Sequence, residues 1–237
     1  GMEILTNSPR VRRTRRINVE LILSDHNTNC ASCIKSGNCT LQTIANDVGI
    51  IVSDYQNTAE MGRWDRNLPL VRDASKCVKC MRCIQVCEKV QGMGVWTLIG
   101  SGYRTTIGLK DNQPFSESDC ALCGQCITHC PVGALRESDD RLDLKDALAD
   151  PEIVTIVLVA PAVRTAWGEQ IGLKDKDATM GKLVCALKKI GIDYVFDTNY
   201  SADLTIMEEG SEFLERLANR NRHKWPMFTS CCPGWLR

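Results

Sequence analysis

The second half of the chain alternates short apolar runs with stretches of helical periodicity. Residues 153–159 form a continuous, mostly β-branched run, which predicts a strand buried on both faces. Helices are predicted over residues 163–171, 180–190 and 202–217, a short strand over 194–196, and a last extended segment over 226–229. Gly191 closes the second helix. Strands that alternate with helices indicate a parallel α/β sheet.

The first half shows no such periodicity, and we expect its cysteines to organise it. Of the 14 cysteines, only Cys185, Cys231 and Cys232 lie beyond Cys130. The others fall into tight groups with short fixed gaps, which favour metal or redox centres over a disulfide framework. The charged stretch 137–150 predicts a surface helix or linker, and we place the boundary between the two halves there.

Composition narrows the choice of partner and compartment. A hydrophobic content of 43% allows a real core, and 29 basic residues balance 29 acidic ones, so the net charge gives no reason to expect nucleic acid or a membrane surface as the main partner. We find neither a secretory signal nor a run of 18 apolar residues, and predict no membrane span. The expected location is the cytoplasm, where thiols stay reduced.

Two cysteine runs share one pattern, Cys-x2-Cys-x2-Cys-x3-Cys, and the second is followed by Pro131. This is the signature of a two-cluster ferredoxin, in which the fourth cysteine of each run binds the other cluster. One 4Fe-4S cluster is then expected on Cys77, Cys80, Cys83 and Cys130, and a second on Cys120, Cys123, Cys126 and Cys87. Zinc is the alternative, but a triplet with a distant fourth cysteine suits it poorly.

A third group lies upstream, where His26, Cys30, Cys33 and Cys39 fall within fourteen residues. A neutral imidazole can replace one thiolate of an iron-sulfur cluster, so these residues predict a third 4Fe-4S site. Tetrahedral zinc with three cysteines and one histidine fits the same spacing. The neighbouring ferredoxin motifs favour iron and sulfide.

A further cysteine and a run of arginines are expected to have structural roles. Cys185 lies among apolar residues of a predicted helix and is expected in the core. The basic run Arg10, Arg12, Arg13, Arg15 and Arg16 is expected on a solvated helix face, with a docking patch for an acidic electron carrier as the alternative.

The segment from His26 through Cys33, together with residues 37–42, resembles a His/Cys module of three families: FeFe-hydrogenases, the large cluster-bearing subunit of respiratory complex I, and some formate dehydrogenases. Two later segments, 159–164 and Thr-Ser-Cys-Cys-Pro-Gly-Trp at 229–235, resemble the first landmarks of the FeFe-hydrogenase catalytic domain. The resemblance covers essentially the whole chain and favours this family.

The resemblance implies roles for residues that their spacing does not assign. Cys232 would bind the 4Fe-4S part of the active-site H-cluster, and Cys231 would hand protons to the bridging amine of its two-iron subsite. Glu209 and Glu212, three apart on a predicted helix, match the family's proton path. On sequence alone a solvated helix face is the favoured explanation, and the motif context reverses that preference. Residues Ala160, Pro161 and Ala162 follow the first predicted strand and would line the two-iron subsite.

The resemblance also implies a mixed fold of three parts: a small His/Cys-ligated module over residues 1–70, a two-cluster ferredoxin-like domain over 71–136, and the first part of a parallel α/β hydrogenase domain over 137–237. The remaining H-cluster cysteines are expected beyond Arg237, so we expect a fragment that is inactive alone and a complete parent protein that carries the H-cluster. The expected activity of that parent is reversible reduction of protons to H2.

The expected partners are ferredoxin or an NADH-oxidising flavin/iron-sulfur subunit, in a possible hetero-oligomer. The alternative function is an electron-relay subunit without hydrogenase activity, as in complex I or formate dehydrogenase.

Overall fold

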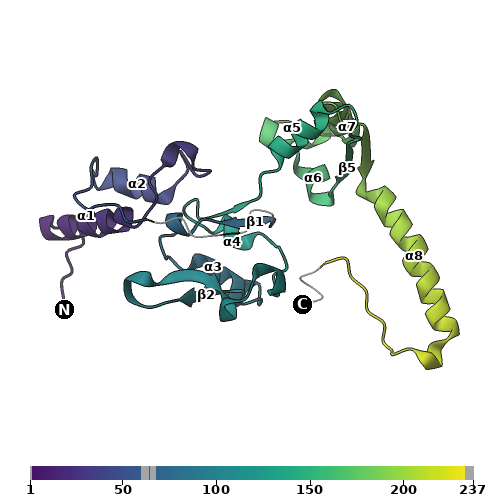
Figure 1. Cartoon of the computed structure of the whole chain (residues 1–237), viewed down its shortest axis with the longest axis horizontal. Coiled ribbons are helices and arrows are strands. Elements are labelled where there is room, and N and C mark those ends of the chain that lie inside the picture. Colours follow the sequence, from purple (N-terminus) through teal and green to yellow (C-terminus); the bar gives the residue numbers. More distant parts are fainter. Residues whose placement is uncertain (1, 60–63, 65–67, 233–237) are drawn as a thin grey trace. The chain divides into compact units, whose positions relative to one another are not determined.

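The computed structural model describes residues 2–59, 64 and 68–232. It divides into two compact units (Figure 1). The first contains the chain up to Ser138 together with the residues from Ser230, and the second is Asp139–Thr229. Within the described residues, no helix is both long and apolar enough to cross a membrane.

The first unit begins with two helices that flank the first cysteine group. Helix α1, Pro9–Ser24, starts where the Ser8 side chain accepts a hydrogen bond from the backbone N–H of Val11 at 3.3 Å, with proline in the first turn. The arginines of the predicted basic run lie on α1 and are exposed. Helix α2, Thr40–Asp47, directly follows Cys39 and buries Leu41. The candidate ligands between residues 26 and 39 therefore occupy the connection between α1 and α2.

The rest of the first unit consists of short elements around the two ferredoxin-type motifs. Strand β1, Leu70–Arg72, pairs antiparallel with β4, Leu135–Glu137, and β2, Trp96–Ile99, pairs antiparallel with β3, Thr106–Leu109. Helices α3, Arg82–Gln85, and α4, Gln125–Thr128, each start inside a cysteine motif. Such short elements bury little by themselves.

Cysteines form part of the hydrophobic core of this unit. Trp96, Ile107 and Val132 are almost fully buried. The same cluster of buried residues includes Cys39, Cys83, Cys126 and Cys130. Side chains that the sequence assigns to metal binding therefore also hold the unit together.

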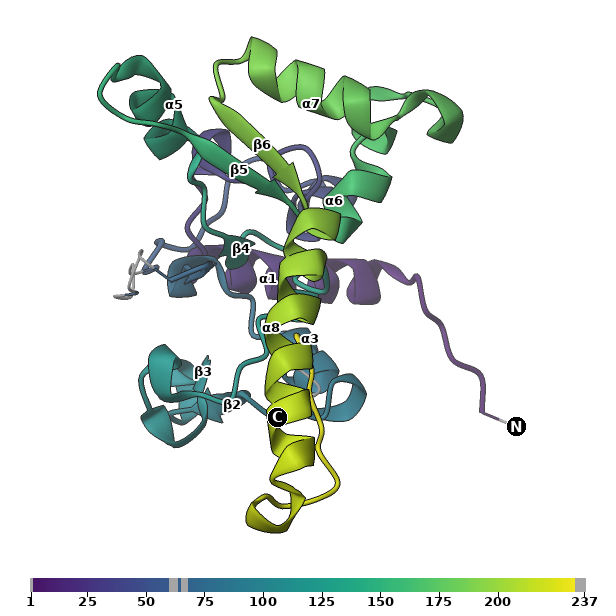
Figure 2. The same ribbon diagram turned by 90° about the vertical axis from the view of Figure 1, so that its right-hand side faces the viewer.

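The second unit contains a parallel strand pair with helical connections. Strand β5, Ile156–Val159, pairs in parallel with β6, Tyr194–Asp197 (Figure 2). The helices are α5, Arg141–Ala149; α6, Pro161–Ala166; α7, Met180–Lys189; and α8, Thr198–Ala218. The predicted helices at 180–190 and 202–217, the short strand and the parallel pairing are confirmed. Gly191, with φ of 108°, follows the end of α7 as predicted.

Several predictions for this unit are wrong. The first strand is buried on one side only, since Ile156 and Leu158 are 62% and 61% exposed whereas Val159 is 3% exposed. The helix expected over 163–171 begins at Pro161 and ends at Ala166, where a favourable N-terminal proline and the later Gly168 set its limits. The segment expected to be extended over 226–229 has no regular structure over residues 227–230, and its extended form stays a prediction.

Cys185 is exposed, not in the core as predicted. Helix α7 buries Leu183, and a residue two positions further along a helix points to the other side. The apolar residues next to Cys185 in the sequence therefore do not surround its side chain in the fold.

Candidate iron-sulfur sites and the C-terminal cysteine pair

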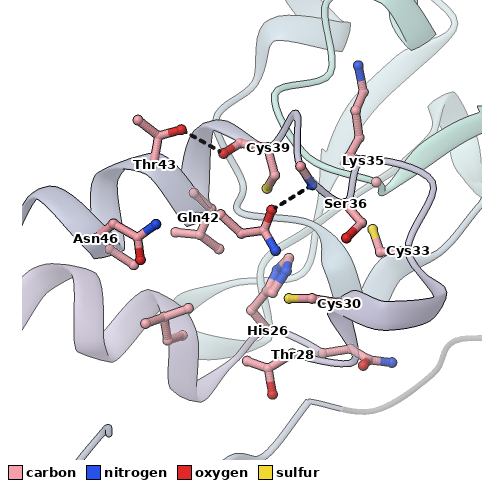
Figure 3. Close-up of a pocket in the computed structure, with 16 residues that line it drawn as sticks. His26, Thr28, Cys30, Cys33, Lys35, Ser36, Cys39, Gln42, Thr43 and Asn46 are labelled. Atoms are coloured by element: carbon pink, nitrogen blue, oxygen red, sulfur yellow. Dashed lines mark hydrogen bonds between the residues drawn. The ribbon is translucent and has the colours of Figure 1, made fainter. Parts of the chain in front are cut away.

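The first cysteine group lines one cavity of about 460 Å³. Figure 3 shows the side chains of His26, Cys30, Cys33 and Cys39 around it. Helix α1 ends just before His26, and the Gln42 side chain accepts a hydrogen bond from the backbone N–H of Gly37 at 3.3 Å, which holds the loop against α2. The fold thus brings together four candidate ligands that are up to thirteen residues apart.

His26 has the features of a ligand in its uncharged form. It is 6% exposed, and within the described structure its Nδ1 is buried without a hydrogen-bond partner. Burial lowers the pKa of His26 below its usual 6.5, and the nearby ammonium of Lys76 lowers it further. A neutral imidazole with an unsatisfied buried nitrogen beside three thiols fits a metal-bound cluster.

The second cavity is lined by Cys77, Cys80, Cys83 and Cys130. Burial is the main cause that raises the pKa of both Cys77 and Cys83, and it raises the pKa of Cys83 to about 12. These thiols are therefore protonated at neutral pH unless a metal displaces the proton. Four soft donors around one cavity, two of them buried, fit an iron-sulfur cluster.

The third cavity, of about 230 Å³, is lined by Cys87, Cys120, Cys123 and Cys126. Burial raises the pKa of Cys126 to about 11, against a hydrogen bond from the side chain of Trp96 that lowers it. The backbone N–H of Val95 donates to the Cys87 sulfur at 3.4 Å. As in the first two cavities, the four residues are those that the motif spacing predicts to act together.

Local backbone geometry explains how the two ferredoxin-type motifs curl. Lys79 and Met81 have φ of 56° and 63°, and Leu122 and Gly124 have φ of 53° and 72°. Only Gly124 is glycine, so backbone strain is stored at two residues of the first loop and at one of the second. The left-handed residues turn each chain sharply between successive cysteines and direct the sulfurs inward.

No three His, Cys, Asp or Glu side chains in the described parts of the chain are arranged to hold a single metal ion.

The C-terminal pair, Cys231 and Cys232, is exposed. The backbone N–H of Cys232 donates to the Ser230 hydroxyl at 3.0 Å. The helix expected to begin at Pro233, and the Pro-Gly-Trp part of the motif, lie outside the described residues. The proposed roles of the two thiols stay predictions.

The two glutamates of the predicted proton path lie exposed on α8. Glu209 accepts a hydrogen bond from the Thr229 hydroxyl at 3.2 Å, and Glu212 forms an ion pair with Arg216 at 2.6 Å. Residues 160–162 are exposed where β5 ends and α6 begins, at the carboxyl edge that the sequence indicates. These contacts are compatible with the predicted roles and also with a solvated surface.

Three residues near the cavities escape sequence reasoning. Arg72 lines the second cavity, Trp96 bonds to a thiol of the third, and Gly133 approaches Cys33 in the first. Nothing in the spacing of a lone arginine, tryptophan or glycine marks it as part of a site. Only the pairing of distant segments brings these residues to the cysteines.

Three sequence families match consecutive parts of the chain. Residues 15–53 match the iron-sulfur binding region of NADH-ubiquinone oxidoreductase G. Residues 69–136 match the ferredoxin-like domain of NADH-quinone oxidoreductase subunit 3, and residues 153–237 match the C-terminal domain of the iron-only hydrogenase large subunit.

Relatives with hydrogenase names match along the whole chain. The chain is 43% identical to "NADP-reducing hydrogenase subunit HndD" of Solidesulfovibrio fructosivorans and 36% identical to "Iron hydrogenase 1" of Clostridium pasteurianum. Both matches cover 100% of this chain and 41% of the relative. The chain therefore spans less than half the length of these relatives.

A solved NAD+-reducing [NiFe]-hydrogenase shares the fold over 76% of this chain and 71% of its own, with a TM-score of 0.54 and 22% identity. At this level of identity the structural similarity is evidence for the fold alone. The relationship to hydrogenases is shown by the sequence matches. The chain is thus related along its whole length to iron-only hydrogenase large subunits, which it matches from the iron-sulfur modules into the C-terminal domain.

Proposed function

We propose that the chain is the electron-transfer region and the beginning of the catalytic domain of an FeFe-hydrogenase. Three cavities, each lined by four residues that motif spacing groups together, carry this proposal. Each would hold one 4Fe-4S cluster, a cofactor that accepts and releases single electrons. The complete parent would reversibly reduce protons to H2.

Groups of the protein itself prepare the three sites for metal. Burial keeps His26 neutral, and buried thiols release protons only when metal binds. Backbone N–H groups donate to the sulfurs of Cys77, Cys87 and Cys120, each at 3.4 Å, and so stabilise negative charge there. The apolar core shields the buried ligands Cys39, Cys83, Cys126 and Cys130 from water, whereas Cys80 and Cys123 are exposed.

The hydrogen chemistry would depend on the second unit and on the C-terminal pair. In the complete parent, Cys232 would bind the H-cluster and Cys231 would move a proton to and from it. Glu209 and Glu212 would relay protons along α8, and residues 160–162 would line the two-iron subsite. The parallel pair β5 and β6 would be part of a larger α/β domain.

A relay subunit without hydrogenase activity explains the first unit equally well but leaves the second unexplained. "NADPH-Fe(3+) oxidoreductase subunit alpha" of Geobacter sulfurreducens matches 57% of the chain at 29% identity. Two hydrogenase relatives match all of it, and residues 153–237 match a hydrogenase domain. This difference in coverage favours the hydrogenase.

The relatives also suggest the electron partner. One is named an NADP-reducing hydrogenase subunit, and another an NADH-quinone oxidoreductase subunit. We propose a hetero-oligomer in which an NAD(P)H-oxidising flavin/iron-sulfur subunit or ferredoxin exchanges electrons with this chain. A cytoplasmic location stays a prediction, because a further relative is named periplasmic, and cell fractionation tests it.

The test of the cluster proposal is iron and sulfide analysis of the anaerobically reconstituted chain, with EPR of the reduced form. About twelve irons and as many sulfides are expected. Cys39→Ala, Cys83→Ala and Cys126→Ala should each remove one cluster. Cys185→Ala is the matched control, because this exposed thiol lies outside all three cavities, and it should keep full iron. Zinc without acid-labile sulfide would contradict the proposal.

A further inference from the structure

The two ferredoxin-type loops are near copies in backbone. Lys79 and Leu122 occupy the same position in each motif, with φ of 56° and 53°. The backbone N–H of Lys79 donates to the Cys77 sulfur at 3.4 Å, and that of Leu122 donates to the Cys120 sulfur at the same distance. Loop geometry therefore does not distinguish the two proposed clusters, and a difference between them has to come from their surroundings.

One short strand ladder supplies such a difference. In the antiparallel pair of β1 and β4, Arg72 lies opposite Leu135 and Leu70 lies opposite Glu137. The end with Arg72 and Leu135 lines the second cavity, and the end with Leu70 and Glu137 lines the third. The ladder thus presents a guanidinium to one cluster site and a carboxylate to the other.

Arg72 is held where its charge acts strongly. Its side chain is half-buried, and its Nη2 donates to the Thr106 hydroxyl at 2.9 Å. Burial lowers the pKa of Arg72, while the nearby Cys77 and Cys83 raise it, so the guanidinium lies close to two of the four predicted ligands. Arginine keeps its charge under such conditions.

Other charges lie near these loops, but several are paired or exposed. Lys76, which precedes Cys77, is paired with Asp73 at 4.0 Å, and Asp73 also acts on Arg72. Lys79 forms an ion pair with Asp25 at 2.7 Å, and Arg82 is exposed to water. Glu137 is exposed as well, so its effect is expected to be weaker than that of Arg72.

We propose that Arg72 and Glu137 separate the reduction potentials of the two ferredoxin-type clusters. Arg72 raises the potential of the cluster on Cys77, Cys80, Cys83 and Cys130, because a nearby cation stabilises the more negative, reduced state. Glu137 lowers the potential of the other cluster for the opposite reason. The inference rests on the proposed function, since it requires both clusters.

Hydrogen bonds to the cysteines of the third cavity oppose the effect of Glu137 on the reduction potential. Val95 donates to the Cys87 sulfur and Trp96 bonds to Cys126, and both contacts raise the potential of the third-cavity cluster. Substitution of Arg72 or Glu137 leaves both donors in place. Changes in midpoint between variants therefore report the charges.

The experiment is an EPR-monitored redox titration of the anaerobically reconstituted full chain. Cys83→Ala and Cys126→Ala assign the two signals, since each removes one cluster of the pair. Arg72→Gln should lower the midpoint of the second-cavity cluster enough to change its oxidised-to-reduced ratio roughly tenfold, about 59 mV for one electron. Arg72→Lys keeps the charge and should restore most of the midpoint.

Glu137→Gln should raise the midpoint of the third-cavity cluster by less, and Glu137→Lys by more. Arg136→Gln is the matched control. Arg136 lies on β4 next to Glu137 but lines neither cavity, so its substitution should shift neither midpoint.

Unchanged midpoints in Arg72→Gln with full iron and sulfide would overturn the inference, and so would an equal shift in Arg136→Gln. If Arg72→Gln fails to retain iron, the exposed Glu137 series decides, and a midpoint that does not rise from Glu to Gln to Lys overturns the role of the ladder. Failure of the proposed function looks different, because the unsubstituted chain would then show no iron-sulfur signal.

Discussion

Gly133 lies so close to Cys33 that a methyl group on its Cα would come within 2.6 Å of the cysteine sulfur. The two residues are a hundred positions apart, one in the first cysteine group and the other just after Cys130. Backbone hydrogen bonds join the same regions, from Asn27 N–H to Ser75 O at 2.8 Å and from Thr40 N–H to Pro131 O at 3.1 Å. The first cavity is thus built directly against the segments that carry the second.

Gly133→Ala should therefore disturb the first site specifically. The added methyl group displaces the Cys33 sulfur, and overpacking of this kind costs about 1–3 kcal/mol. We expect lower iron content and loss of the EPR signal of the His26-ligated cluster, with the other two signals retained. Gly181→Ala is the matched control, since a methyl group there meets nothing within 4 Å, and it should keep all three signals.

Removal of metal should loosen the first unit and leave the second intact. The core of the first unit includes Cys39, Cys83, Cys126 and Cys130, so loss of clusters removes cross-links at the centre of the core. The second unit is held by the β5–β6 ladder and its helices, and α7 is capped by the Thr179 hydroxyl. Hydrogen exchange after anaerobic chelation should accelerate around residues 77–87 and 120–130 but not in β6. Equal acceleration in both units would contradict this division.

Glu209→Ala in the complete parent enzyme should lower H2 turnover by roughly a hundredfold or more, as is typical for loss of a proton-transfer group. The structure places the Glu209 carboxylate within 3.2 Å of the Thr229 hydroxyl, two residues before Cys231. Glu208→Ala is the control, because Glu208 is the neighbour of Glu209 on the same helix, is also exposed and has no proposed role. Turnover that falls equally in both variants would assign the loss to the helix, not to a proton path.

The sequence predicts the cluster groupings better than the fold around them. Ligand chemistry fixes the spacing within a motif, so His26 and the eleven cysteines up to Cys130 meet in the groups that spacing predicts. Helices α7 and α8 are also predictable, because their apolar positions recur with helical periodicity.

The wrong predictions concern properties that the neighbouring residues in the sequence do not determine. Cys185 has apolar neighbours, but its direction on α7 exposes it. The apolar run at β5 predicts burial on both faces, yet Ile156 and Leu158 remain exposed in this chain. Arg72 lines the second cavity at the end of β1, opposite Leu135 of β4, more than sixty residues later. Burial and long-range pairing are properties of the folded chain, and no local pattern records them.

Acid should weaken the second unit through a contact at the start of its strand pair. The Asp193 carboxylate accepts hydrogen bonds from the backbone N–H and hydroxyl of Thr155, at 2.7 and 2.9 Å. These bonds lower the pKa of Asp193 below its usual 3.8, with a smaller contribution from Lys188. The folded chain thus prefers the ionised form, and the contribution of this contact to the free energy of unfolding is fully present above about pH 4.

That contribution should decline as pH falls through the lowered pKa of the folded state, because a protonated carboxyl accepts these bonds poorly. Thr155→Val removes the hydroxyl donor and should move the Asp193 midpoint, measured by carboxyl NMR titration, back toward 3.8. Urea unfolding of the second unit should then depend less on pH between about 5 and 2. Asp203→Asn, at an exposed position on α8, should leave the Asp193 midpoint unchanged. A midpoint that stays low in Thr155→Val would show that the backbone N–H alone holds the carboxylate in its ionised form.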